Sequence, residues 1–203
     1  MYPWMKMAFD RFFSLMGLLL LSPLFLLVAL WIKLDSPGPV FFRQRRIGYL
    51  RKEFYLIKFR TMRADTPSDI PTHLMSEASR FITMSGRFLR KTSLDELPQL
   101  INVLKGEMSL VGPRPALWNQ ADLIKLREER HVHSVKPGIT GYAQVQGRDE
   151  LPIPDKAALD GYYVQHQSLW FDLKVLFMTV GAVLNTKGVA EGDEPTNSKG
   201  VKR

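Results

Sequence analysis

SLDELPQLINVLKGEMSLVGPRP, residues 93–115, is the most informative stretch of the chain because it joins an acidic pair to a rigid basic corner. Its pattern predicts a helix over residues 94–103 that carries Asp95 and Glu96 in its first turn. Arg114 follows between two prolines, which restrict the backbone on both sides of it. Two carboxylates beside a fixed guanidinium suit a metal-bound substrate that carries phosphate.

The acidic pair also has a purely structural explanation. Ser93 and Glu96 show the S-x-x-E spacing of a capping box, and acids in a first helical turn interact favourably with the helix dipole. The same dipole would keep the Asp95 carboxylate ionised, and the ionised form is the one that attacks phosphorus. The residues alone therefore leave a structural and a catalytic role open.

An uncharged apolar run, FFSLMGLLLLSPLFLLVALWI, occupies residues 12–32. As a helix it would reach roughly 30 Å, the thickness of one hydrocarbon core, so a single transmembrane anchor is one interpretation. Ser22-Pro23 at the midpoint predicts a sharp kink, and basic residues on both flanks favour both ends on the cytoplasmic side. A re-entrant hairpin that enters one leaflet satisfies both observations.

The following residues predict a small, mostly helical α+β domain. Two segments, residues 40–45 and 53–62, alternate in the manner of strands and are expected to form a hairpin around Gly48. A loop rich in proline and hydroxyl residues is expected over residues 65–76. Helices are expected at three places: residues 80–90, 94–103 and 118–130.

The charge balance favours anionic partners. The chain has 28 basic and 20 acidic residues, for a net charge of +8, and eight of the basic residues lie within residues 43–63 beside the apolar run. At that place they suit anionic lipid headgroups. Nucleic acid is not the expected partner, because the aromatic residues of this segment alternate with apolar strand residues. The absence of cysteine excludes disulfides and thiolate metal sites.

Near the C-terminal end, residues 168–186 predict a further helix with one broad apolar face. Asp172 and Lys174 make it too charged to cross a membrane. Two interpretations stay open: a helix of the protein core, or an amphipathic helix in the headgroup plane with Trp170 as an interfacial anchor.

Several motifs together resemble the bacterial sugar transferase family, the monotopic phosphoglycosyl transferases, over residues 1–186. They are SLDELPQL, the Pro-Arg-Pro corner, KFRTM at residues 58–62 and KPGITGYAQVQGR at residues 136–148. The resemblance implies a re-entrant membrane helix broken at Ser-Pro and a site at the cytoplasmic face of the bacterial inner membrane. The implied reaction moves a sugar-1-phosphate from a nucleoside diphosphate sugar, usually a UDP-sugar, to polyprenol phosphate, the first membrane step of glycan assembly.

The resemblance also implies roles for individual residues. Asp95 would attack the β-phosphorus of the donor and carry the phosphosugar covalently until polyprenol phosphate displaces it. Mg²⁺ is the expected cofactor, with Asp95 and Glu96 as candidate ligands. Asp160 lies in an Asp-x-x-Tyr pattern that could instead support the fold. The expected substrate-binding residues are Arg90, Arg114, Lys58, Arg60, Gln144, Arg148 and Asp160.

This interpretation divides the chain into three parts. Residues 1–34 are the re-entrant membrane helix, residues 35–187 the cytoplasmic catalytic domain and residues 188–203 a flexible tail. One alternative is a membrane-tethered basic protein that binds anionic phospholipid or a partner and needs neither Mg²⁺ nor the acidic pair. Another keeps the substrates but makes Asp95 a base in a ternary complex. No residue distinguishes which sugar is carried.

Overall fold

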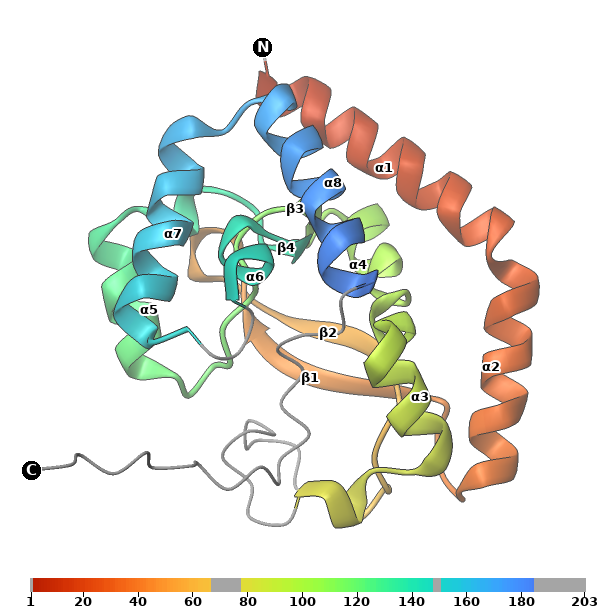
Figure 1. The fold of residues 1–203 in the computed structure, drawn as a ribbon. Helices are drawn as coiled ribbons and strands as arrows, with labels where there is room; N and C mark the ends of the chain where they lie inside the picture. The colour runs from red at the N-terminus through yellow and green to blue at the C-terminus, as the bar shows by residue number, and fades with distance from the viewer. Residues whose placement is uncertain (1, 67–77, 148–150, 185–203) are drawn as a thin grey trace, which may run out of the picture.

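The computed structural model describes residues 2–66, 78–147 and 151–184. Figure 1 shows the hairpin β1–β2 at the centre, with α1 and α2 along one side and α5 and α7 on the other. The prediction of a mostly helical α+β fold with a short hairpin is confirmed. The helices are α1 (Tyr2–Leu20), α2 (Ser22–Asp35), α3 (Met84–Thr92), α4 (Gln99–Lys105), α5 (Ala121–Glu129), α6 (Tyr142–Gly147), α7 (Ile153–His166) and α8 (Leu169–Leu184), and the strands are β1 (Phe41–Ile47), β2 (Glu53–Phe59), β3 (Ser109–Val111) and β4 (Gly138–Thr140).

The two N-terminal helices meet at a sharp bend of 62°. Pro23 lies in the first turn of α2, where its missing N–H costs no helical hydrogen bond, and the Ser22 hydroxyl donates to the Leu19 carbonyl at 2.8 Å. Within the described ranges no single helix is long and apolar enough to cross a membrane, and α1 and α2 reach that threshold only as a bent pair. The predicted break at Ser22-Pro23 is therefore present in the fold.

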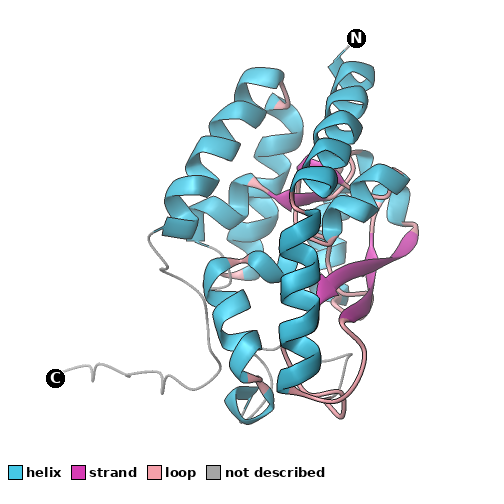
Figure 2. Cartoon of the chain, turned by 90° about the vertical axis from the view of Figure 1, so that its right-hand side faces the viewer, coloured by secondary structure: helices cyan, strands magenta, loops and turns pink. Residues whose placement is uncertain are grey.

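The outer side of both helices is apolar, but their buried sides differ, because α1 buries the polar residues Asp10 and Ser14 and α2 buries apolar ones. Val28 and Ile32 of α2 pack inward against Phe59 and Leu89. The outer side, which faces the viewer in Figure 2, carries large exposed apolar side chains, an arrangement that soluble monomers rarely show. Those at least half exposed are Trp4, Phe12, Phe13, Leu19, Leu20, Leu26, Leu27, Leu30 and Leu34.

The predicted hairpin is confirmed with shifted ends. β1 and β2 pair antiparallel in a register that sets Phe41 opposite Phe59 and Arg45 opposite Tyr55. Phe54 and Leu56 of β2 are buried with Val103 and Met108 of the α4 region, while Tyr55 between them is exposed. This alternation matches the period of two on which the sequence prediction depended.

Asn102 of α4 completes the outer edge of β2. Its Oδ1 accepts from the Ile57 N–H at 3.0 Å, and its Nδ2 donates to the Tyr55 carbonyl at 2.8 Å. Asn102 is fully buried, so these backbone groups have no access to water at this contact. The Asn102 side chain therefore forms the hydrogen bonds that a neighbouring strand would form, and it fixes α4 against the hairpin.

Asn102→Leu is expected to lower the free energy of unfolding by about 3 kcal/mol, because two buried backbone groups lose their partner. Thermal unfolding in detergent would measure the loss. Gln165→Leu is the matched control, since Gln165 is an exposed amide of α7 and its substitution should cost less than about 0.5 kcal/mol. An equal loss in the two variants would contradict the role assigned to Asn102.

A second, two-stranded sheet was not predicted. β3 and β4 pair parallel, with Ser109 opposite Gly138 and Val111 opposite Thr140. Gly112 approaches the backbone of Gly138 so closely that a Cβ on either residue would collide with the other. This close contact fixes the chain immediately before Arg114 to the chain immediately before α6.

Other predicted boundaries need correction. The helix expected over residues 80–90 is α3, which begins at Met84 after a short 3-10 turn, and the one expected over residues 118–130 is α5, which begins at Ala121. No helix was predicted after residue 140, where the chain forms α6. The helix expected over residues 168–186 is confirmed as α8. The loop expected over residues 65–76 lies mostly outside the described residues, and the expected tail lies wholly outside them.

Asp172 of α8 joins the first helix of the chain to the last one. Its Oδ2 accepts hydrogen bonds from the Tyr2 hydroxyl and the Lys6 ammonium of α1, each at 2.5 Å. Its Oδ1 accepts from the Tyr163 hydroxyl of α7 at 2.7 Å, and that hydroxyl also lies 3.1 Å from the Val111 carbonyl. Asp172 is buried, and these partners satisfy a charge that would otherwise be costly to bury.

Candidate active site

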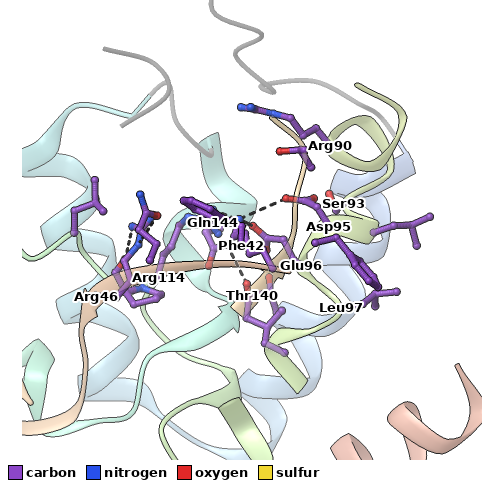
Figure 3. A pocket seen from close by; sticks show the side chains of 18 of the residues that line it. Phe42, Arg46, Arg90, Ser93, Asp95, Glu96, Leu97, Arg114, Thr140 and Gln144 are labelled. Atoms are coloured by element: carbon purple, nitrogen blue, oxygen red, sulfur yellow. Dashed lines mark hydrogen bonds and ion pairs between the residues drawn. The ribbon is translucent and has the colours of Figure 1, made fainter. Parts of the chain in front are cut away.

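Asp95 and Glu96 line a cavity of about 870 Å³. Its walls come from segments far apart in the sequence: the hairpin, the turn that holds the acidic pair, the chain after β3, α6 and α8. Figure 3 shows the pair with Arg90 on one side and Arg46 and Arg114 on the other. The volume is in the range of pockets that enclose small-molecule ligands.

The helix predicted over residues 94–103 is wrong in its first half. Leu94–Glu96 form a 3-10 turn, and α4 begins at Gln99, after Pro98, which has no N–H with which to continue the turn. The predicted capping box is also wrong, because Ser93 has a φ of +57° and its side chain caps nothing. This left-handed residue ends α3 and turns the chain, so that Arg90 and the acidic pair reach the same cavity.

Two cations converge on one oxygen of the pair. Glu96 Oε1 accepts from Lys58 Nζ at 2.7 Å and from Arg114 Nη2 at 2.9 Å. The same Lys58 Nζ lies 3.6 Å from Asp95 Oδ2. β2 supplies the lysine, and the chain after β3 supplies the arginine, so two sheets position the charges around the turn that carries the acids.

The two carboxyl groups differ in their electrostatics. Burial raises the pKa of Asp95; the charge on Glu96 adds to this effect, whereas Lys58, Arg90 and Arg114 oppose it. Burial alone would also raise the pKa of Glu96, but Arg114 and Lys58 together lower it well below its usual range. The predicted stabilisation of the Asp95 charge by the first turn of a helix is wrong, because α4 begins only at Gln99. Lys58, Arg90 and Arg114 favour the ionised carboxylate instead.

A buried ion pair between Arg127 and Asp160 fixes the Pro-Arg-Pro corner at residues 113–115. Arg127 of α5 donates through Nη1 to the Arg114 carbonyl at 2.7 Å and through Nε to Asp160 Oδ2 at 2.9 Å. Arg127 and Asp160 are 2% and 1% exposed. Burial raises the pKa of Asp160, and Arg127 opposes the shift. Asp160 thus supports the arginine corner, the structural alternative that its sequence pattern left open.

The remaining predicted residues take different places. Arg60 donates through its two terminal nitrogens to the Pro37 and Ser36 carbonyls, at 2.5 Å and 2.6 Å, so it fixes the end of α2. Arg60 also lines the cavity, so it has this structural role at the wall of the site where the substrate contact was predicted. Gln144 lines the cavity from α6 and donates to the Ile139 carbonyl at 3.2 Å. Arg148 lies outside the described residues.

Further polar residues of the cavity were not predicted from the sequence. Gln44 and Thr140 line it from the hairpin and from β4, and Arg127 lines it from α5. A short-range signal existed only for Gln44, which lies two residues before Arg46 and accepts a hydrogen bond from its Nε at 3.1 Å. Arg127 has its partner Asp160 33 residues away, so no local pattern could identify it.

The acidic pair fits a magnesium site that substrate completes. Within the described part of the chain, no group of three or more His, Asp or Glu side chains could hold a metal ion. Asp95 and Glu96 therefore offer at most two carboxylate ligands. Mg²⁺ in phosphoryl-transfer enzymes commonly takes one or two carboxylates and completes its octahedron with substrate phosphate and water.

A buried acidic pair, set among several cations in one cavity, defines a site suited to phosphorylated substrates. The chain belongs to the bacterial sugar transferase family, whose family model matches residues 1–186. The family assignment made from the sequence motifs is confirmed.

Three relatives illustrate the range of the family. The chain is 43% identical over 185 residues to a UDP-glucose:undecaprenyl-phosphate glucose-1-phosphate transferase of Xanthomonas campestris pv. campestris, covering 88% of this chain and 38% of the relative. It is 46% identical over 185 residues to an undecaprenyl-phosphate glucose phosphotransferase of Komagataeibacter xylinus, covering 86% and 35%. It is 42% identical over 192 residues to the uncharacterized sugar transferase EpsL of Bacillus subtilis (strain 168), covering 95% and 93%. The chain thus spans little more than a third of the first two relatives.

Proposed function

We propose that the protein is a membrane-bound phosphoglycosyl transferase. It moves a sugar-1-phosphate from a nucleoside diphosphate sugar, such as a UDP-sugar, to a polyprenol phosphate. The observation that carries the proposal is the buried acidic pair, whose Glu96 is paired with Lys58 and Arg114 inside a basic cavity. The names of the first two relatives, which specify undecaprenyl phosphate and a glucose phosphate, support the same reaction class.

The first step is an attack by a carboxylate oxygen of Asp95 on the β-phosphorus of the donor. A bond forms between this oxygen and phosphorus, and the bond from phosphorus to the bridging oxygen breaks. The bridging oxygen leaves with the nucleoside monophosphate, and the phosphosugar stays on Asp95 as an acyl phosphate. Lys58 and Arg114 fix the neighbouring Glu96, and Arg90 faces the same cavity as a further phosphate contact.

The second step regenerates the carboxylate. A phosphate oxygen of the polyprenol phosphate attacks the same phosphorus, and the bond to Asp95 breaks, which gives a polyprenol diphosphate sugar. Splitting the transfer in this way lets the two substrates react one after the other. The kinetic mechanism is then ping-pong, whereas Asp95 acting as a base in a ternary complex would give sequential kinetics.

Mg²⁺ belongs to this proposal as the cofactor, held by Asp95 and Glu96. When bound, it would neutralise charge on the donor phosphates. Glu96 suits the role because its lowered pKa keeps it ionised at neutral pH.

Membrane attachment through α1 and α2 completes the proposal. The 62° bend and the apolar outer side of this pair support a re-entrant insertion into the cytoplasmic leaflet of the bacterial inner membrane. Trp170 and Phe177 on α8 are 81% and 77% exposed, which supports the interfacial interpretation of that helix. The site would then lie close to the leaflet that contains the lipid acceptor.

The decisive experiment incubates the full chain with a panel of nucleotide sugars and Mg²⁺ but without lipid. One donor should release about one equivalent of nucleoside monophosphate in a burst and add the mass of its phosphosugar to Asp95. Adding undecaprenyl phosphate should restore turnover. Release that occurs only when both substrates are present would contradict the covalent step.

Removal of divalent cations is expected to stop monophosphate release, because charge neutralisation on the phosphates is the main demand of this chemistry. Chelation should lower the rate by at least about a hundred-fold, and added Mg²⁺ should restore it. Binding to anionic vesicles serves as the control, since chelation should leave it unchanged. A membrane-tethered binding protein would show salt-sensitive vesicle binding and no release under either condition.

A further inference from the structure

The cavity has an apolar part beside its charged one. Figure 3 shows Arg46 and Arg114 on one side of the acidic pair and Leu97, with Arg90, on the other. Further apolar residues of the lining come from the α4 region, β3 and α8, where Thr179 lies among them. The residues that define this apolar arm are Leu97, Leu100, Leu110, Leu176 and Val183.

The apolar arm lies between two helices whose outer surfaces are also apolar. On one side Leu100 is in contact with α1, because a Cβ built on Gly17 would lie 3.2 Å from its Cδ1. On the other side Leu176 of α8 is 37% exposed, and its neighbour Phe177 is 77% exposed. Apolar side chains therefore occur both on the outside of α8 and along the arm that leads to Asp95.

We propose that the apolar arm binds the isoprene units next to the phosphate of the polyprenol phosphate acceptor. This inference rests on the function proposed above and adds the place where the lipid chain lies. A nucleoside diphosphate sugar is polar along its whole length and has no long apolar group that would favour a mostly apolar wall. An isoprenoid chain gains free energy with each apolar group that it buries, and its phosphate end would meet Lys58 and Arg90 beside the acidic pair.

The arrangement gives each substrate its own part of the cavity. The donor phosphates meet Arg46 and Arg114, while the lipid enters between α4 and α8. Asp95 lies between the two parts, so a phosphate oxygen of the lipid can reach the phosphosugar that Asp95 carries. A site divided in this way fits a reaction in which the carboxylate meets the two substrates in turn.

The absence of native cysteine allows a direct test by thiol protection. Leu176→Cys places a single accessible thiol in the apolar arm, and Val180→Cys, one turn further along α8 and 59% exposed, is the matched control outside the cavity. Undecaprenyl phosphate in detergent should slow labelling of Cys at position 176 by at least about tenfold and leave position 180 within about twofold. Protection by a nucleotide sugar, or equal protection by phosphatidylglycerol, would overturn the proposal.

A kinetic measurement provides a second test in case the thiol variant folds poorly. Leu176→Trp narrows the arm and should raise the KM for undecaprenyl phosphate by at least about tenfold, whereas Val180→Trp should not. A rise in the KM for the nucleotide sugar instead would place the donor in the arm and refute the inference. The protection experiment needs no turnover. Failure of the wild-type release assay would therefore refute the proposed function, whereas the absence of lipid protection would refute only the place inferred for the lipid.

Discussion

Asp95→Asn is expected to abolish monophosphate release, with a fall of at least about a thousand-fold, equivalent to about 4 kcal/mol of activation free energy. The amide is nearly the same shape as the carboxylate, but it is not a nucleophile. The burst assay with donor alone measures the effect, and intact-mass analysis should find no phosphosugar on the variant. Full turnover by Asp95→Asn would refute the covalent mechanism.

The stability of this variant separates a chemical role from a structural one. Burial raises the pKa of Asp95, so at neutral pH the ionised side chain costs the folded state free energy relative to the unfolded chain. Removing the charge should therefore leave the melting temperature unchanged or raise it. Asp122→Asn, at an exposed position of α5, is the control and should keep both activity and stability.

Arg127→Met should produce the largest loss of stability, about 3–5 kcal/mol, because it leaves the Asp160 carboxylate buried without its partner. For a chain of this length the melting temperature should fall by about 10 °C. Arg127 also holds the Arg114 carbonyl, so activity should fall even at temperatures where the variant is folded. A melting temperature equal to that of the wild type would contradict this account.

Two comparisons isolate the buried charge as the cause. The double variant Arg127→Met with Asp160→Leu removes both charges and should recover most of the lost stability, but not the activity. Arg51 and Glu128 form an ion pair in which both side chains are more than half exposed. Arg51→Met should therefore cost less than about 1 kcal/mol.

Local patterns in the sequence predicted the elements that depend on local physics. The hairpin followed from the alternation around Gly48, and the bend of the N-terminal helices followed from Ser22-Pro23. The acidic pair and Arg114 were expected to lie together, and Arg114 does pair with Glu96, but neither the burial of Asp95 nor the backbone conformation of the pair was predicted. Pro98 indicated that the helix begins after it. The prediction instead followed the capping-box spacing at Ser93 and began the helix too early.

Features that depend on contacts between residues far apart in the chain could not be predicted from local sequence patterns. β3 and β4 are too short for any periodicity, and their pairing depends on the close approach of Gly112 and Gly138. Arg60 was predicted as a substrate contact from its basic motif; it does line the cavity, but its hydrogen bonds to the end of α2 were not predicted. A charged residue in a sequence can be expected to have an interaction partner, but the identity of that partner depends on the folded structure.

The contact of Lys6 with Asp172 sets an order of events during synthesis. The two residues are 166 positions apart, and Tyr2 depends on the same carboxylate. At translation rates of roughly 5–20 residues per second, the ammonium group of Lys6 leaves the ribosome roughly 8–33 seconds before its counter-charge. If α1 attaches to the membrane as proposed, it would reach the lipid surface well before the last helix is made, and α8 would complete the assembly by packing onto a segment already in place.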